Sequence, residues 1–256
     1  MWQRQLPEKY EGCTSLTQCS WDEANYYCNN LKYSGYSDWR MPQTQEMVSI
    51  VNYSGISPAV DQIVFPQTPS FSFWTAPLIT IWPQPSYYNN YARYVSVTGW
   101  VSDKVLTNQG STAKHLIRCV RGGSTNSGVG SFTRFTTIGE VGSQVIRDSI
   151  VNLTWANVSN QMNWRDALSF CESLSFAGNT DWRLPSIKQA ISLVNYSKTS
   201  PASDLSNLPS VIWTSSTQAA NASNAFKIDF SNWGSVGAMD KANATTAYAF
   251  CVRGGP

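Results

Sequence analysis

The sequence predicts an α+β fold made of two tandem copies of one domain, each with two helices followed by an antiparallel, strand-rich half. The chain matches itself without a gap when it is shifted by 143 residues, so that 21–66 falls on 164–209. In this stretch 19 of 46 positions are identical, far more than a shared composition gives by chance. Both copies close on the same pentapeptide, CVRGG, at 119–123 and 251–255. We therefore predict a duplicated domain of roughly 120 residues, an ordinary size for one hydrophobic core.

The first helix of each copy is predicted from its cap and its apolar spacing. Ser20 and Glu23 are spaced as a capping box, and Asn163 and Asp166 repeat the pair in copy 2. The apolar residues that follow stand at i, i+3, i+7 and i+10, which places them on one helix face. They are Trp21, Ala24, Cys28 and Leu31 in copy 1, and Trp164, Ala167, Cys171 and Leu174 in copy 2.

The remaining elements follow in the same order in both copies. A second, shorter helix is expected near 44–51 and near 187–194. Beyond it, β-branched and aromatic residues indicate strands at 71–76, 94–100 and 115–121, with counterparts in copy 2.

The boundary between the copies has the composition of a flexible linker, STNSGVGS at 124–131, which gives domains at 1–123 and 132–256. The copies begin differently. About 20 residues upstream of Trp155 have the alternation and glycines of a hairpin, whereas the matching Trp2 stands at the start of the chain. We therefore expect copy 1 to lack this hairpin, because upstream residues were removed or because a strand comes from elsewhere.

Composition and charge argue against several classes of protein. Charged residues are 13% of the chain, the net charge is +2, and each half carries 9 Lys/Arg and 8 Asp/Glu. A nucleic-acid binder or a polybasic membrane binder concentrates positive charge, so neither is expected. The sequence has no run of 18 apolar residues and no recognisable signal peptide. We expect no membrane span, and either a cytosolic protein or the mature or trimmed form of an exported one.

The cysteines favour an exported protein. Their number is even, no C-x-x-C pair occurs, and His115 is the single histidine, so Cys/His metal sites are not expected. Disulfides indicate an oxidising compartment. A nucleophilic or redox cysteine is the alternative, but no histidine or basic cluster stands close enough in sequence to lower a thiol pKa. The expected bridges are Cys28–Cys119 and Cys171–Cys251, each from the first helix to the last strand of its copy, and Cys13–Cys19, which is unique to copy 1.

Several motifs occur in both copies: W-x-x-A-x-x-(Y/F)-C-x-x-L, then G-x-x-DWR-(M/L)-P, VNYS-x-x-SPA-x-D and the closing CVR. Together they resemble the Lcl C-terminal domain family, a bacterial domain named after a collagen-like adhesin, over nearly the whole chain. The helix–cysteine segment and the closing RGG also resemble the wider C-type lectin-like superfold. The resemblance implies two tandem C-type lectin-like domains in a bacterial protein that is secreted, on the cell surface or in the periplasm. It further implies adhesion or glycan binding, although a fold alone does not establish a ligand.

The DWR-P element has a catalytic and a structural interpretation. A catalytic element would use the aspartate as a base and the arginine as an anion clamp. We favour the structural interpretation, a buried turn whose charges satisfy one another and backbone groups. Asp61 and Asp204 of SPA-x-D are likewise expected to cap turns. The residues of the element are Asp38, Trp39 and Arg40 in copy 1, and Asp181, Trp182 and Arg183 in copy 2.

Two activities found on the C-type lectin-like superfold are not expected. The signatures of calcium-dependent sugar sites, Glu-Pro-Asn, Gln-Pro-Asp and Trp-Asn-Asp, are missing, and Gln84-Pro85-Ser86 lacks the acid. The oxidase chemistry of formylglycine-generating enzymes needs free cysteines, whereas all six here are assigned to bridges. We therefore expect no metal, no cofactor and no enzymatic activity.

The copies differ most in one loop. Trp74 and Trp100 are 26 positions apart, whereas Trp213 and Trp233 are 20 apart. The longer loop of copy 1 is rich in aromatic residues and asparagine, as a sugar-stacking surface or a protein interface requires. Packing of these rings against copy 2 or against their own sheet is the alternative. The candidate ligand or interface residues are Trp82, Tyr87, Tyr88, Asn89, Asn90, Tyr91 and Arg93.

These observations lead to three hypotheses of function. The first is a non-enzymatic binding or adhesion protein, secreted or in the cell envelope, with a glycan or protein as ligand. The alternative is a structural subunit of an extracellular or periplasmic assembly such as a pilus, flagellar sheath or filament, in which copies of itself or other subunits complete the first domain. An enzyme of the formylglycine-generating class is disfavoured, because neither free thiols nor a paired-acid motif is expected.

Overall fold

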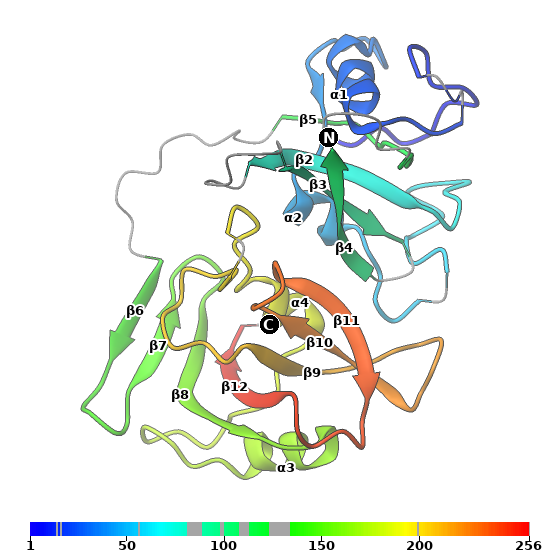
Figure 1. Ribbon diagram of the computed structural model, residues 1–256. Helices are drawn as coiled ribbons and strands as arrows, with labels where there is room; N and C mark the ends of the chain where they lie inside the picture. Colours follow the sequence, from blue (N-terminus) through cyan, green and yellow to red (C-terminus); the bar gives the residue numbers. More distant parts are fainter. Residues whose placement is uncertain are drawn as a thin grey trace. The chain divides into compact units, whose positions relative to one another are not determined.

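The computed structural model divides into unit 1 (Met1–Thr125) and unit 2 (Asn126–Pro256), and both units mix a few helices with many strands, as predicted (Figure 1). None of the described helices is long and apolar enough to cross a membrane. The linker expected at 124–131 lies outside the described residues. The structure describes residues 1–13, 15, 17–55, 57–80, 89–97, 100–107, 113–122, 134–198 and 200–255, without the side chains of 77–80, 89–91 and 100–107.

The sheet of unit 2 has the strand order β11-β10-β9-β12-β8-β7-β6. Neighbouring strands are antiparallel except β9 and β12, which run parallel. Helix α3 packs against β12 and β9, and α4 packs against β9 and β10. The elements are β6 (Phe135–Ile138), β7 (Val145–Asp148), β8 (Leu153–Gln161), α3 (Trp164–Ser173), α4 (Ile187–Ile191), β9 (Val211–Thr217), β10 (Asn224–Asp229), β11 (Ser235–Asp240) and β12 (Tyr248–Gly254).

The hairpin predicted upstream of Trp155 is present as β6 and β7. The guanidinium of Arg134 donates to the fully buried carboxylate of Asp148 at 2.7 Å, and also to the carbonyl oxygen of Ser192 at 2.6 Å. These bonds attach the hairpin to the segment that follows α4.

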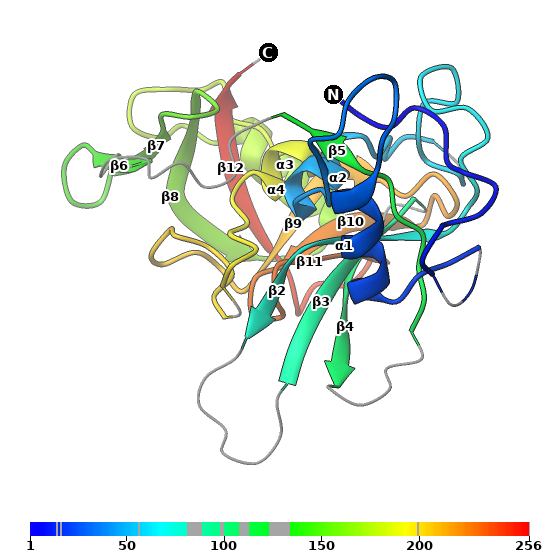
Figure 2. The same cartoon turned by 90° about the horizontal axis from the view of Figure 1, so that it is seen from above.

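Strand β8 follows the hairpin and pairs with β12 along its length. The register runs from Leu153 opposite Gly254 to Gln161 opposite Tyr248, and both views show the two strands side by side (Figures 1 and 2). One strand, with a register shift between Phe250 and Val252, therefore covers this edge of β12 and ends just before α3.

Unit 1 has the antiparallel order β2-β3-β4, and a short separate pair, β1 with β5. Helix α2 packs against β2 and β3. The elements are α1 (Trp21–Asn30), β1 (Trp39–Arg40), α2 (Thr44–Ser49), β2 (Ser72–Thr80), β3 (Asn89–Ser96), β4 (Trp100–Thr107) and β5 (Val120–Arg121).

Two predicted strands of unit 1 were wrong in extent. The segment 94–100 is not one strand, because residues 94–96 are the end of β3 and Trp100 is the first residue of β4. The segment 115–121 is regular only over β5, with isolated bridges at His115 and Leu116. Its counterpart β12 is a full strand because β8 pairs with it on both sides of one irregularity between Phe250 and Val252, whereas unit 1 has only isolated bridges here among its described residues.

The caps of the first helices follow the prediction in unit 1 and depart from it in unit 2. Ser20 Oγ accepts from the Glu23 amide, and the Glu23 carboxylate accepts from the Ser20 amide at 2.8 Å, a complete capping box. Asn163 accepts from the Asp166 amide, but the Asp166 carboxylate binds the Asn163 side-chain amide. Aspartate is one methylene shorter than glutamate, so the reciprocal bond is replaced by a local one.

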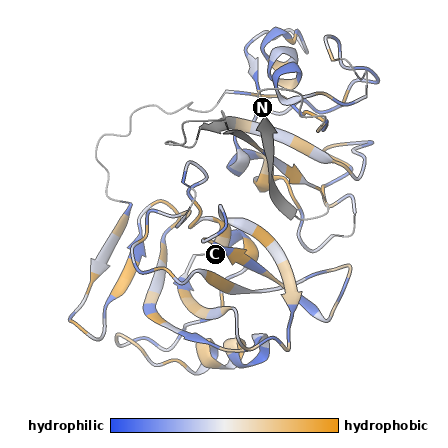
Figure 3. Cartoon of the chain, in the orientation of Figure 1, coloured by the Kyte–Doolittle hydropathy of each residue, from blue (hydrophilic) through white to orange (hydrophobic). Residues whose placement is uncertain are grey.

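Helix α3 carries both hydrophilic and hydrophobic residues along its length (Figure 3).

The same indole contacts hold the core of both units. Trp74 and Trp213 are fully buried. Their ring N–H groups donate to the carbonyls of Cys19 and Met162, at 2.7 and 2.9 Å. The tryptophan at the start of each first helix donates its ring N–H to a carbonyl of the sheet. Trp21 donates to Thr75 O at 2.9 Å, and Trp164 donates to Thr214 O at 2.7 Å. Each indole thus buries a large apolar surface without leaving its donor unpaired.

The structure contains the three expected disulfides, Cys13–Cys19, Cys28–Cys119 and Cys171–Cys251, and leaves no cysteine free. The two long-range bridges close 91 and 80 residues and connect the first helix to the end of the same unit. The third closes only 6 residues.

We predict that removal of a long-range bridge costs much more stability than removal of the short one. On the chain-entropy model the loss is roughly 4.5 kcal/mol for C28A/C119A and roughly 2 kcal/mol for C13A/C19A, because the cost grows with the closed loop. Urea unfolding of both double variants measures this difference. Equal losses would contradict the assignment of Cys28–Cys119 as the main covalent constraint of unit 1.

Candidate functional site

The DWR-P element has buried tryptophans and exposed acids. Trp39 and Trp182 are 3% and 2% exposed, whereas the Asp38 and Asp181 side chains are 59% and 60% exposed. Each indole N–H donates to two carbonyls of the preceding tight turn, those of Tyr33 and Tyr36 in unit 1 and those of Phe176 and Asn179 in unit 2. The tryptophan therefore fixes the turn that leads into the element.

The expected pairing within the DWR-P element was wrong. Asp38 binds Arg121, and Asp181 binds Arg253, each at 2.7 Å, so the acid pairs with the arginine of the closing CVR motif. The hydrogen bond from Arg121 lowers the pKa of Asp38, as Arg253 lowers the pKa of Asp181. A lowered pKa is opposite to that of a general base poised near neutral pH, and this supports the structural interpretation.

The arginine of the element differs between the units. Arg40 donates to both carboxylate oxygens of Glu46, at 2.8 and 2.7 Å, and to the carbonyl of Gly122 at 2.8 Å. In unit 2 the position of Glu46 is occupied by Gln189. Arg183 donates to the carbonyl of Gly254 at 2.8 Å, and its buried Nη1 has no hydrogen-bond partner among the described residues.

Of the two SPA-x-D aspartates, Asp61 caps a turn as predicted, since its Oδ1 accepts from the amides of Ile63 and Val64. Asp204 instead accepts from Asn195 Nδ2 at 2.9 Å and from Lys198 Nζ at 2.7 Å. Partial burial would raise the pKa of Asp204, but these two donors lower it.

The aromatic loop predicted as a ligand or interface site falls mostly outside the described residues. Trp82, Tyr87 and Tyr88 are not described. Asn89, Asn90 and Tyr91 form the start of β3, without described side chains. Arg93 lies in β3 opposite Thr75 and is 1% exposed. The role of this loop stays a prediction.

A different candidate arises where unit 1 replaces β8 of unit 2. At one end, Trp2 bridges to Val120 as Trp155 pairs with Val252. At the other end, the Cys19 amide donates to the His115 carbonyl at 2.9 Å, just as the Met162 amide donates to the Ala247 carbonyl at 3.2 Å. Trp2 and Trp21 are 19 positions apart, whereas Trp155 and Trp164 are 9 apart, so unit 1 has 10 extra residues here (19 − 9). Between the two anchors, the described residues of 4–18 do not continue the strand and contain only turns and one isolated bridge, Ser15 with Gln18; we call this segment the loop 4–18.

Buried contacts hold the base of this loop. Arg118 is fully buried and donates to the carbonyls of Gln3 and Arg4, at 2.6 and 2.8 Å. Burial lowers the pKa of Arg118 to about 10, which still leaves it charged at neutral pH. Tyr10 is 1% exposed, donates to the carbonyl of Ile117 at 2.9 Å, and packs edge-on against Tyr27, with 5.0 Å between ring centroids. The far end of the loop is closed by Cys13–Cys19.

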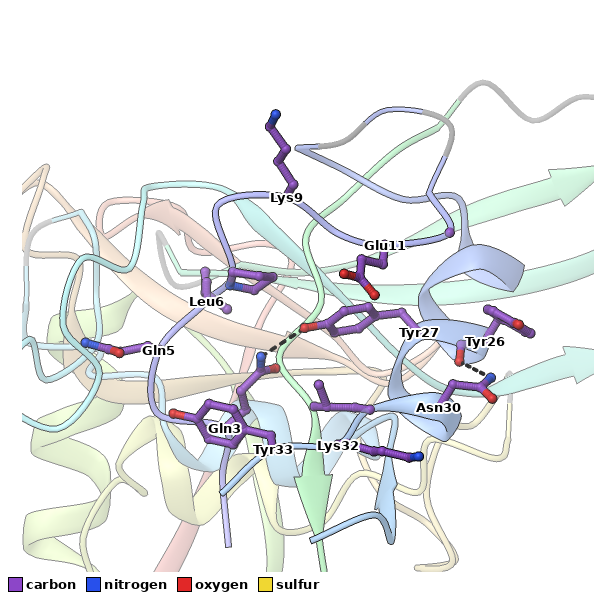
Figure 4. Close-up of a pocket in the computed structure, with 13 residues that line it drawn as sticks. Gln3, Gln5, Leu6, Lys9, Glu11, Tyr26, Tyr27, Asn30, Lys32 and Tyr33 are labelled. Atoms are coloured by element: carbon purple, nitrogen blue, oxygen red, sulfur yellow. Dashed lines mark hydrogen bonds between the residues drawn. The ribbon is translucent and has the colours of Figure 1, made fainter. Parts of the chain in front are cut away.

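The N-terminal residues and α1 border an open groove of about 780 Å³, which we call the unit 1 groove (Figure 4). Gln3 Nε2 donates to the Tyr27 hydroxyl at 3.2 Å at its base, and burial raises the pKa of Tyr27, which keeps this hydroxyl protonated. Tyr26 is 62% exposed. The loop contributes Gln3, Gln5, Leu6, Pro7, Lys9, Glu11 and Gly12, and the helix side contributes Tyr26, Tyr27, Asn30, Leu31, Lys32 and Tyr33.

The groove combines aromatic rings, amides and a few well-separated charges, which is the chemistry of a reversible binding site. In unit 2 the positions of Tyr26 and Asn30 are occupied by Ser169 and Ser173, and the loop is 10 residues shorter. Among the described residues, no group of three or more His, Cys, Asp or Glu could hold a metal ion.

A family model for the Lcl C-terminal domain matches residues 1–121 and 144–253. The chain belongs to the Lcl C-terminal domain family. The two matches correspond to the two units and confirm the predicted duplication. No curated protein and no solved structure is similar enough to the chain to count as a match.

The unit 1 groove was missed at the level of sequence, although two signals pointed to it. One is the extra length between Trp2 and Trp21 relative to Trp155 and Trp164. The other is the pair Cys13 and Cys19, which has no counterpart in copy 2. Neither signal reveals that the extra residues fold over α1.

We predict that Glu46→Gln destabilises the protein at neutral pH by about 1 kcal/mol, because Arg40 and the Gln43 amide lose a charged acceptor. Burial alone would raise the pKa of Glu46, but these donors lower it below its usual 4.5. A lowered folded-state pKa stabilises above pH 4.5, and this contribution is lost as the pH falls through the folded value. Thermal unfolding from pH 7 to pH 3 should therefore show the two proteins converging in acid.

The matched variant in unit 2 is Gln189→Glu. It places a carboxylate beside the buried Nη1 of Arg183 and should raise the melting temperature at pH 7 and not in acid. A pH-independent effect of either variant would contradict the proposed ion pair.

Proposed function

We propose that this chain is a non-enzymatic binding or adhesion protein, secreted or in the cell envelope, which holds a glycan or protein ligand in the unit 1 groove. The observation that carries the proposal is the loop 4–18. It joins two anchor points that unit 2 connects with one short strand, so the fold itself does not require it.

The cost of ordering this loop supports a role beyond folding. Fixing the backbone of 10 extra residues costs roughly 10–20 kcal/mol of conformational entropy. A disulfide, a buried arginine and a buried tyrosine that contact the loop offset part of this cost. The ordered loop forms one side of an open groove lined by tyrosines and amides.

The remaining chemistry agrees with binding and not with catalysis. The charged side chains of the groove are Lys9, Glu11 and Lys32, and all three are exposed. Three disulfides suit an oxidising environment outside the cytosol. We extend the proposal to a C-type lectin-like fold for each unit, on the motifs and the helix-to-end bridge.

A structural role in an assembly is the second proposal, favoured by the hairpin of unit 2. Among the described residues β6 pairs only with β7, and Ile138 and Val141 are 46% and 95% exposed. Apolar side chains at a strand edge favour contact with further copies. Sedimentation of the wild type and of I138K/V141K over a range of concentration tests this: a monomer at every concentration would remove the proposal.

The binding proposal is tested with the full chain on arrays of glycans and of host-matrix and envelope proteins. We expect a ligand whose binding is lost in Tyr26→Ala and weakened in C13S/C19S, because the first removes the exposed ring and the second releases the loop. Phe71→Ala is the control, since Phe71 is also exposed, at 52%, but does not line the groove.

A ligand that binds all three variants equally would place the site elsewhere and overturn the role of the groove. Melting temperatures measured alongside separate loss of binding from loss of folding, and Tyr26→Ala should leave the melting temperature unchanged.

A further inference from the structure

We propose that the ligand of the unit 1 groove is an uncharged oligosaccharide, with one sugar ring packed on the exposed face of Tyr26. This inference rests on the proposed function and gives its ligand a chemical class. Four features of the groove limit the chemical class of its ligand. They are the exposed ring of Tyr26, the polar groups, the charges and the walls.

Tyr26 presents an aromatic ring whose position is held by the loop. It lies in α1 and is 62% exposed. A Cβ added to Gly12 would lie 3.4 Å from Tyr26 Cδ1, so the loop backbone passes close to the ring edge. Gly12 has a φ of +83°, a conformation that glycine adopts without strain and that brings the backbone this near. The ring edge is therefore supported while much of the side chain is left for a ligand.

The polar groups that line the groove can serve as both donors and acceptors. Asn30 Nδ2 donates to the Tyr26 carbonyl at 2.8 Å, which holds the asparagine and directs its own oxygen to other partners. Tyr27 accepts from Gln3 and still has a hydroxyl proton to donate. Sugar hydroxyls also donate and accept, so side-chain amides and phenols match them where purely cationic groups do not.

The charges of the groove argue against an anionic chain. Lys9 and Lys32 are balanced in part by Glu11, and the described residues that line the groove include no arginine. Recognition of sulfate, phosphate or carboxylate groups favours arginine, whose fork binds such anions with two hydrogen bonds. A carboxylate such as Glu11 would repel them and would instead accept hydrogen bonds from neutral hydroxyls.

The walls of the groove argue against an extended peptide. One wall is a helix and the other is an irregular loop, so neither offers the strand edge on which an extended peptide adds main-chain hydrogen bonds (Figure 4). The volume of about 780 Å³ falls within the range of roughly 300–1,000 Å³ that holds ligands of a few rings. A short stretch of a neutral glycan fits both observations.

The experiment uses the full chain and isothermal titration with neutral oligosaccharides of glucose, mannose and N-acetylglucosamine, and with a heparin hexasaccharide. We expect a neutral oligosaccharide to bind with little dependence on salt. Tyr26→Ala should weaken this binding about tenfold or more, because a ring contact at the centre of a small site dominates its affinity. Tyr26→Phe keeps the ring and should stay within about threefold, and Phe71→Ala should equal the wild type.

Two results would overturn the inference. One is binding of the heparin hexasaccharide with a steep loss in salt and no binding of the neutral series. The other is neutral-glycan binding that Tyr26→Ala leaves unchanged. If no oligosaccharide binds but a protein ligand is lost in Tyr26→Ala, the inference fails and the binding function stands. If the groove variants change no interaction at all, both fail.

Discussion

The covalent bridge from the first helix to the last segment is the constraint on which each unit depends. Cys28 and Cys119 are fully buried, and so are Cys171 and Cys251. The bridge holds the helix against the end of the unit, and the indole at the start of the helix donates to a carbonyl of the sheet, in β2 of unit 1 and in β9 of unit 2. With that distance fixed, the closing CVR motif lies beside the DWR-P element, and the aspartate of one binds the arginine of the other.

The two first helices and the two long-range disulfides could be predicted because their residues occupy matching positions in both copies. The hairpin of copy 2 and the bridge Cys13–Cys19 occur in one copy only and were predicted from local spacing. The family match later confirmed the same two copies. Aligned repeats are informative because a coincidence in one copy is unlikely to recur in the other at the same position.

The incorrect predictions share a different cause. In each case the structure of a residue or segment depends on a partner that is distant in the sequence. Arg121 and Asp38 are 83 positions apart, so a neighbour such as Arg40 was the natural but wrong choice. The segment 115–121 has strand-forming residues but lacks a continuous partner, and strand propensity is decided by such context. The groove likewise depends on where the loop 4–18 folds. The lysine, glutamate, proline and glutamine residues of this loop carry no pattern that predicts which surface the loop covers.

The loop 4–18 lies between two anchors that unit 2 also has, the bridge of Trp2 to Val120 and the hydrogen bond of Cys19 to His115. Residues between two such fixed points can change in length and composition without disturbing what lies beneath them. A gene carrying this domain twice can therefore keep one copy as a conservative scaffold while the other explores new recognition surfaces. The asymmetry between the copies at this loop therefore lies in a segment where sequence change carries little risk to folding.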